Sequence, residues 1–194
     1  MNSSASPLLI TVHGHESANP AAVADALSGN IRTEAEPLAD CAVFVVNPAS
    51  GIDQQTIAMW QSIDEFQTPR ILVVTQIENQ DADFDDAVML ANRVFDQMTT
   101  PYLVLHDDSG TPCALISLET MRIIDYSTNP PTDMACESEH ETLVQEFRDE
   151  YLEMKSSMGE GAFAAGLMFP AIPLWIEKGI GVDLVRDYLN QLTN

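Results

Sequence analysis

The chain has 194 residues and a hydrophobic fraction of 45%, which is enough to build one domain around a substantial core. Its 30 acidic and 8 basic residues give a net charge of −22, which repels phosphate-rich partners and disfavours nucleic-acid binding. No apolar run approaches the roughly 18 residues of a membrane span, and residues 1–6 lack the basic start of a signal peptide. We therefore expect a single-domain cytoplasmic protein whose acidity reflects a solvated surface or adaptation to high salt.

The first predicted elements are a strand and a helix. Residues 7–12 form a short apolar run that ends just before Gly14, which predicts a strand followed by a turn. A helix should begin near Pro20, because the missing N–H of proline is harmless at a first helical position. Good helix formers continue from there to Leu27.

The next two apolar runs predict a pair of parallel strands. Residues 41–46 and 71–74 are short, apolar and rich in β-branched side chains, which is typical of strands covered on both faces. Between these runs, apolar residues recur at helical spacing: Ile57, Trp60, Ile63 and Phe66. A strand, a helix and a strand in this order predict a right-handed βαβ unit.

A fourth apolar pattern predicts a packing helix with an acidic start. One helical face is formed by Phe84, Val88, Ala91, Phe95 and Met98. Four carboxylates precede or open this helix: Asp81, Asp83, Asp85 and Asp86. The spacing lacks the turn glycine and the twelfth-position glutamate of a calcium loop, so we expect these carboxylates to complement the helix dipole and predict no metal site.

The second half of the chain predicts strands, a loop and a long helix. Residues 102–105 should form a strand, residues 112–127 a small hairpin, and residues 127–137 an irregular loop. His106, Asp107 and Asp108 are more typical of an exposed turn than of an acid–base site. A long helix should then bury one apolar face, which consists of Leu143, Phe147, Tyr151, Met154 and Met158. The last strand and the start of the last helix are predicted at residues 167–175 and 179–184.

Two segments resemble the G domain of the translational GTPases, elongation factor G in particular. Residues 50–60 read Ser-Gly-Ile-Asp-Gln-Gln-Thr-Ile-Ala-Met-Trp, similar to the family's Gly-Val-x-x-Gln-Thr-x-x-x-Trp. Residues 68–75 read Thr-Pro-Arg-Ile-Leu-Val-Val-Thr, where the family has Val-Pro-Arg before a strand. Residues 106–110 and 122–127 are similar to segments of the elongation-factor-G-like paralogues of actinobacteria. The resemblance implies a P-loop GTPase-like three-layer α/β sandwich with about five mainly parallel strands and a β-hairpin insertion at about residues 112–127.

The resemblance also places the family's phosphate loop, Gly-His-x-x-x-Gly-Lys-Thr-Thr, on this chain. Gly14 and His15 match its start, whereas Asn19 replaces the second glycine, Pro20 the lysine and Ala21 the hydroxyl that ligates magnesium. A phosphate loop needs glycine for backbone donors, lysine for charge and a hydroxyl for the metal. The loop is therefore expected to bind phosphate poorly.

The two segments that hold guanine in the family are changed as well. The guanine-reading Asn-Lys-x-Asp motif falls on Thr75, Gln76, Ile77 and Glu78, and the supporting Ser-Ala loop falls on Trp175 and Ile176. Glutamate is one methylene longer than the family's aspartate and cannot hold the same bidentate geometry without moving back. The resemblance thus implies a degenerate nucleotide site at these positions.

Only ten residues separate Asn30 from Cys41, where the family has two switches and two strands. Such a short segment predicts a connecting loop, so the parts that sense the γ-phosphate should be missing. We therefore predict a pseudo-GTPase that serves as a protein-binding or regulatory module, with no catalytic residue and no cofactor. The alternative is a weak GTP-binding enzyme that uses GTP and magnesium. The later domains of elongation factor G are not expected in this chain.

The shortened segment also leads to an expectation about partners. Without the two family strands, the first strand should present an uncovered edge from Leu8 to Val12. Unpaired backbone groups on a strand edge are a template for another chain. We therefore expect an unidentified protein partner, or a second copy of the chain, to pair there.

Overall fold

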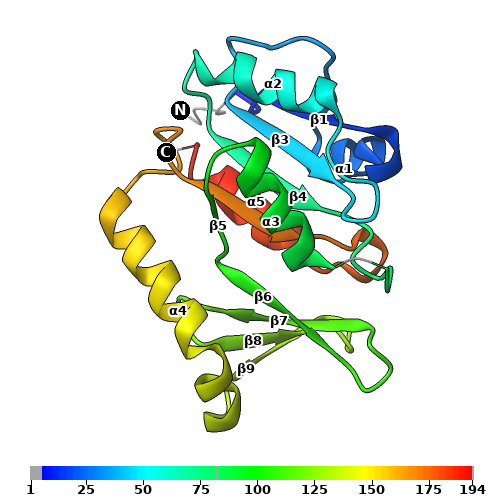
Figure 1. Ribbon diagram of the computed structural model, residues 1–194, viewed down its shortest axis with the longest axis vertical. Helices are drawn as coiled ribbons and strands as arrows, with labels where there is room; N and C mark the ends of the chain where they lie inside the picture. The colour runs from blue at the N-terminus through cyan, green and yellow to red at the C-terminus, as the bar shows by residue number, and fades with distance from the viewer. Residues whose placement is uncertain (1–5, 82, 194) are drawn as a thin grey trace, which may run out of the picture.

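Six parallel strands form the main sheet, in the order β2-β1-β3-β4-β10-β5 (Figure 1). The computed structural model describes residues 6–81 and 83–193, so the expectation about a signal peptide falls almost wholly outside the described residues. The strands are β1 (Ile10–Gly14), β2 (Asn30–Ile31), β3 (Cys41–Val46), β4 (Arg70–Val74), β5 (Met98–Thr99) and β10 (Phe169–Pro173). The predicted mainly parallel α/β sheet is confirmed. It has six strands instead of about five, and the two strands at its edges, β2 and β5, are only two residues long.

Helices cover both faces of this sheet. The helices are α1 (Pro20–Leu27), α2 (Gln54–Asp64), α3 (Phe84–Val94) and α5 (Val182–Asn190). Figure 1 shows α2 and α3 on one face and α1 and α5 on the other. Every residue of β3 and β4 is buried, which agrees with their continuous apolar sequences. The result is a three-layer sandwich.

The prediction that the first strand has an uncovered edge is wrong. Strand β2 pairs with β1 through Thr11 and Val12, so β1 lies inside the sheet. The backbone N–H of Arg32, directly after β2, also donates to the Val12 carbonyl at 3.2 Å on this side of β1. Strand β2 therefore occupies the side of β1 that was expected to be open, which removes the reason for expecting a partner at residues 8–12.

The predicted hairpin is part of a second, antiparallel sheet, in the order β6-β7-β8-β9. Its strands are β6 (Tyr102–His106), β7 (Pro112–Ser117), β8 (Arg122–Asp125) and β9 (Thr132–Ala135). Two predictions therefore need correction. The excursion extends beyond residues 112–127, and the expected irregular loop at residues 127–137 contains β9, which pairs with β8 from Arg122–Ala135 to Asp125–Thr132.

The long helix α4 (Ser138–Met158) packs along one side of this second sheet (Figure 1). Its predicted apolar face is buried only in part. Tyr151 is buried, as is Val144 two turns earlier, whereas Leu143 is 70% exposed and Phe147 is 52% exposed. Two large apolar side chains of α4 therefore face solvent. None of the helices within the described ranges has the length and hydrophobicity of a transmembrane segment.

Candidate functional site

Three loops that carry the predicted nucleotide-site positions meet at one edge of the main sheet. They follow β1, β4 and β10, and the carboxyl ends of parallel strands lie at the same edge. The Thr75 hydroxyl, just after β4, donates to the Ala18 carbonyl in the loop after β1 at 2.8 Å. The Leu174 N–H, just after β10, donates to the Val74 carbonyl at 2.8 Å. The parallel topology thus brings the three loops into direct contact.

Six of the ten predicted positions line one small cavity at this edge. These are Asn19, Thr75, Gln76, Glu78, Trp175 and Ile176, joined by Ala22, Leu174 and Glu177. The cavity volume is about 40 Å³, whereas sites for small molecules usually measure about 300–1,000 Å³. The positions where the family holds guanine therefore converge here, in a space that suits only a few water molecules.

Backbone pairing holds one wall of this cavity. Trp175 and Ile180 exchange N–H to carbonyl hydrogen bonds of 3.0 Å on both sides, around the short 3-10 helix η2 (Ile176–Lys178). In the family, a backbone N–H of this loop supports the base. At Trp175 that donor is already used.

The loop after β1 uses its own backbone donors. It is wound into the 3-10 helix η1 (Glu16–Ala18), in which Ala18 N–H donates to the His15 carbonyl at 3.0 Å and Asn19 N–H to the Glu16 carbonyl at 2.9 Å. The Ser17 N–H donates to Nδ1 of His15 at 3.2 Å. A phosphate loop works because such N–H groups point at the ligand, so these three donors are not free to do so.

Asn19 closes this turn and begins the next helix. Its backbone lies in the left-handed region, with φ 55° and ψ 55°, and its side-chain oxygen accepts from the Ala22 N–H at 3.4 Å as the N-cap of α1. Pro20 then fills the first helical position, where it has no N–H to offer. The substitutions at these positions thus suit a capped helix start. Pro20 and Ala21 line none of the cavities described here.

Two polar side chains from neighbouring strands anchor the same loop; Thr75 is one of the predicted positions, whereas sequence reasoning missed Asn47. Asn47, directly after β3, donates from Nδ2 to the Ser17 carbonyl at 3.1 Å, and Thr75 binds the next carbonyl along, that of Ala18. Nothing in the local pattern around Asn47 indicates this role. The contact spans 30 residues and depends on the register of β1 and β3.

Gly14 and His15 lie in a different hollow, of about 340 Å³, beside Asp53 and Thr56 at the start of α2. A Cβ on Gly14 would lie 2.4 Å from the Val45 carbonyl oxygen, so this glycine allows β1 and β3 to approach closely. In this structure its role is in packing.

Buried His13 lines the same hollow and is held as a structural group. Its ring contacts the Thr11 hydroxyl at 2.9 Å and the Arg32 carbonyl at 3.0 Å. Burial lowers the pKa of His13, opposed by the hydrogen bond to Arg32. Among residues 6–81 and 83–193, no three His, Cys, Asp or Glu side chains are grouped so as to hold a metal ion.

Comparison with known proteins relates the chain to translation factors. No family model matches the sequence. An elongation factor G-like protein of Mycobacterium tuberculosis is 28% identical over 168 residues, which cover 74% of this chain and 23% of the relative. The elongation factor G-like protein of Thermotoga maritima is 25% identical over 169 residues, which cover 77% of this chain and 25% of the relative.

A more distant relative and a solved structure extend the comparison. The mitochondrial ribosome-releasing factor 2 of Drosophila persimilis is 23% identical over 129 residues, covering 62% of this chain and 17% of that protein. A protein of Thermus thermophilus with a known crystal structure superposes with a TM-score of 0.69 at 21% identity, over 81% of this chain and 26% of that one. The chain spans about a quarter of the length of the elongation factor G-like relatives. It is therefore similar in sequence to the elongation-factor-G-like proteins and has the α/β fold expected of a G domain of that kind.

Proposed function

We propose that this translation-factor-like domain is a pseudo-GTPase, a G-domain scaffold that has lost tight GTP binding and serves as a protein-binding or regulatory module. The observation that carries the proposal is the loop after β1, whose Ser17, Ala18 and Asn19 N–H groups donate within the loop itself. A phosphate that entered would have to break these bonds before it gained any contact. The base-side cavity of about 40 Å³ supports the same conclusion.

The missing side chains weaken phosphate binding further. With Asn19, Pro20 and Ala21 in place of glycine, lysine and a hydroxyl residue, one cation, one donor and one metal ligand are lost together. Each charge-assisted contact contributes about 1.5–3 kcal/mol, so the sum is several kcal/mol even if the losses are not additive. At about 1.4 kcal/mol per tenfold change, a micromolar site becomes millimolar or weaker.

The loop between β2 and β3 leaves no counterpart for the family's switches. Residues 32–40 hold no helix or strand. At the start of this segment the Arg32 N–H donates to the Val12 carbonyl, and at its end Asp40 forms two hydrogen bonds with Leu9, directly before β1. A switch must order when the γ-phosphate is bound and release when it is gone. A nine-residue segment held at both ends by hydrogen bonds has little freedom to order and release in this way.

Calorimetric titration with GTP and GDP in the presence of magnesium is the direct test. We expect no binding tighter than millimolar, for the reasons given above. ATP serves as the control nucleotide, because ATP and GTP would share any weak contact that involves the triphosphate alone. Saturable GTP or GDP binding with a Kd below about 10 μM would overturn the proposal and favour a weak GTPase.

Restoring the phosphate-loop side chains should not restore hydrolysis. The triple variant Asn19→Gly, Pro20→Lys and Ala21→Thr replaces the lost charge and metal ligand but supplies no switch and no group to position an attacking water. Magnesium-dependent phosphate release from GTP should therefore stay at the level of the unmutated protein. Release well above that level would mean that the lost side chains, and not the missing switches, prevent catalysis.

A further inference from the structure

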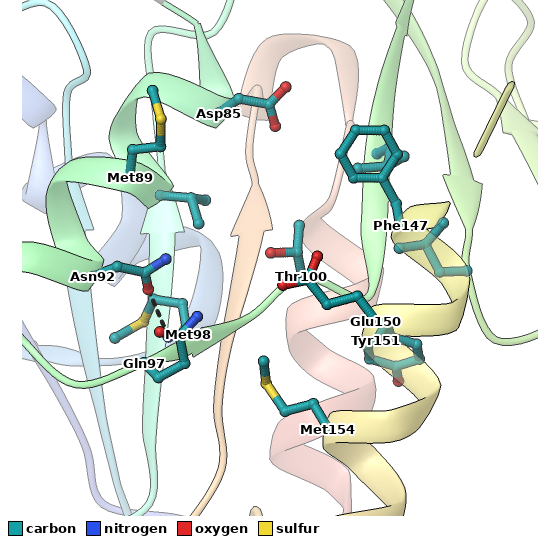
Figure 2. A pocket seen from close by; sticks show the side chains of 13 residues that line it. Asp85, Met89, Asn92, Gln97, Met98, Thr100, Phe147, Glu150, Tyr151 and Met154 are labelled. Atoms are coloured by element: carbon teal, nitrogen blue, oxygen red, sulfur yellow. Dashed lines mark hydrogen bonds between the residues drawn. The ribbon is translucent and has the colours of Figure 1, made fainter. Parts of the chain in front are cut away.

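Two adjacent cavities form one groove between α3, α4 and β6, and Figure 2 shows the larger of them by measured volume. Their volumes are about 310 Å³ and 190 Å³. Both are lined by Asp85 of α3, Leu103 of β6 and Phe147 of α4, so they are continuous along this side of the molecule. The groove lies where the second sheet and its helix meet the main sandwich, and Ile77 at one end of it stands between Gln76 and Glu78 of the small cavity. We call it the α3–α4 groove.

The walls of the groove are apolar and partly open to solvent. Met89 is 55% exposed and Phe147 is 52% exposed on its two sides, and Leu143, one turn before Phe147 on α4, is 70% exposed. Side chains at positions i and i+4 lie on the same face of a helix. Leu143 therefore extends the exposed apolar face of α4 beyond the groove.

Three of the thirteen residues that line the larger cavity are methionines. Figure 2 shows Met89 of α3, Met98 of β5 and Met154 of α4 around the same space. The unbranched, polarisable methionine side chain adapts to irregular partners and is common on surfaces that receive amphipathic helices. The lining therefore suits the apolar face of another helix better than a small rigid ligand.

The charge around the groove is one-sided. Asp83, Asp85 and Glu150 line its two cavities, and neither cavity is lined by a lysine or arginine. Helix α4 carries six carboxylates and only two cations, Arg148 and Lys155. Both cations are turned to the second sheet, where Arg148 binds the Leu118 carbonyl and Lys155 pairs with Glu119.

We propose that the α3–α4 groove binds an amphipathic helix of a partner protein, with apolar anchors entering the groove and Lys or Arg residues facing its carboxylate rim. The inference rests on the proposed role as a protein-binding module and names the chemistry of the partner. A second copy of this chain is the wrong occupant, because it brings another net charge of −22 to an acidic surface. An anionic lipid is disfavoured by the same rim.

A designed peptide tests this inference directly. The probe is a helix of about 18 residues, five turns long, with leucine at positions i, i+3, i+4 and i+7 and lysine elsewhere, labelled for fluorescence anisotropy. A scrambled peptide of the same composition and a version with glutamate in place of lysine are the controls. We expect saturable binding of the designed peptide alone, weakened as salt is raised, because complementary charge is screened by ions.

Matched variants locate the site. Phe147→Ser should weaken binding about tenfold or more, as loss of a buried aromatic anchor usually does, whereas Phe66→Ser, at a side chain of similar exposure (42%) after α2, should change nothing. Asp85→Asn with Glu150→Gln should weaken binding at low salt and flatten its salt dependence, and Asp25→Asn on α1 is the charge control. Phe147 and Phe66 are half exposed, so both variants should fold.

Several results would overturn the inference. They are equal binding of the designed and scrambled peptides, no binding of the designed peptide, equal effects of Phe147→Ser and Phe66→Ser, or sedimentation showing a dimer that Phe147→Ser abolishes. The nucleotide titrations report on a different cavity, which shares no lining residue with the groove. If the protein binds both GTP tightly and the designed peptide, the pseudo-GTPase proposal is rejected and the helix partner is kept. If it binds neither, the pseudo-GTPase proposal is kept and the helix partner is rejected.

Discussion

Replacing Arg70 with alanine is expected to lower the free energy of unfolding by about 3 kcal/mol, through loss of a buried stack and the cavity left behind. The Arg70 side chain is only 1% exposed. Its guanidinium carbon lies 4.5 Å from the Trp60 ring centre and 4.4 Å from that of Phe169. Arg70 of β4 thus links α2 to the neighbouring strand β10. It also donates to the Trp60 carbonyl at 3.3 Å and to the Asp64 carboxylate at 2.7 Å.

The stack contributes more than the ion pair. The Asp64 side chain is 66% exposed, so it regains water when the guanidinium is removed and leaves no buried unpaired charge. A planar guanidinium fits between two rings in a way that an ammonium group cannot. Arg70→Lys should therefore recover only part of the lost stability.

The matched control for Arg70 is an exposed ion pair. Arg122 lies 2.6 Å from Asp133 on β8 and β9, but its side chain is 46% exposed. Such pairs contribute about 0–1 kcal/mol, so Arg122→Ala should barely shift the urea midpoint of unfolding. Equal losses in the two variants, measured as free energies of unfolding in urea, would show that the stack around Arg70 adds nothing.

Local patterns predicted the main sheet because its central strands are simple cases. Residues 41–46 and 71–74 are covered on both faces, so their sequences are continuously apolar, and they form β3 and β4 as expected. The residues of β6 are only half-buried, apart from exposed His106. Their short apolar run indicates a strand but not the sheet to which it belongs, which is why the four-stranded antiparallel sheet was predicted only as a hairpin.

The candidate site was predictable in its positions but not in its conformation. Order along the chain is enough to place Asn19, Thr75 and Trp175 at one sheet edge. The turn η1, however, depends on the His15 ring accepting the Ser17 N–H and on Asn47 reaching the Ser17 carbonyl. The first contact is local, but the second spans 30 residues and depends on the register of β1 and β3.

The same limit applies to α4. The spacing of Leu143, Phe147 and Tyr151 predicts one apolar face, but only Tyr151 is buried. Helical periodicity identifies a face and does not say whether this chain or another one covers it. In this case the uncovered part of the face borders the α3–α4 groove.

Gly181→Ala is expected to lower the free energy of unfolding by about 3 kcal/mol, from a left-handed backbone cost of about 1 kcal/mol plus the shift forced by a clash. Gly181 caps α5 with φ 77°, and a Cβ there would lie 1.9 Å from the Pro173 carbonyl oxygen at the end of β10. Either the start of α5 or the end of β10 must move to admit a methyl group.

Gly179 provides the control for Gly181 two residues earlier in the same turn. Its φ is 73°, but a Cβ would meet no atom within 4 Å. Gly179→Ala should therefore cost only the backbone component, about 1 kcal/mol. Urea unfolding curves measure both losses.

Because Trp175 and Ile180 are paired around this turn, only Gly181→Ala should also shift tryptophan emission in the folded state. Similar losses for the two alanine variants would mean that β10 and α5 can separate at no cost, contrary to the close approach at Pro173.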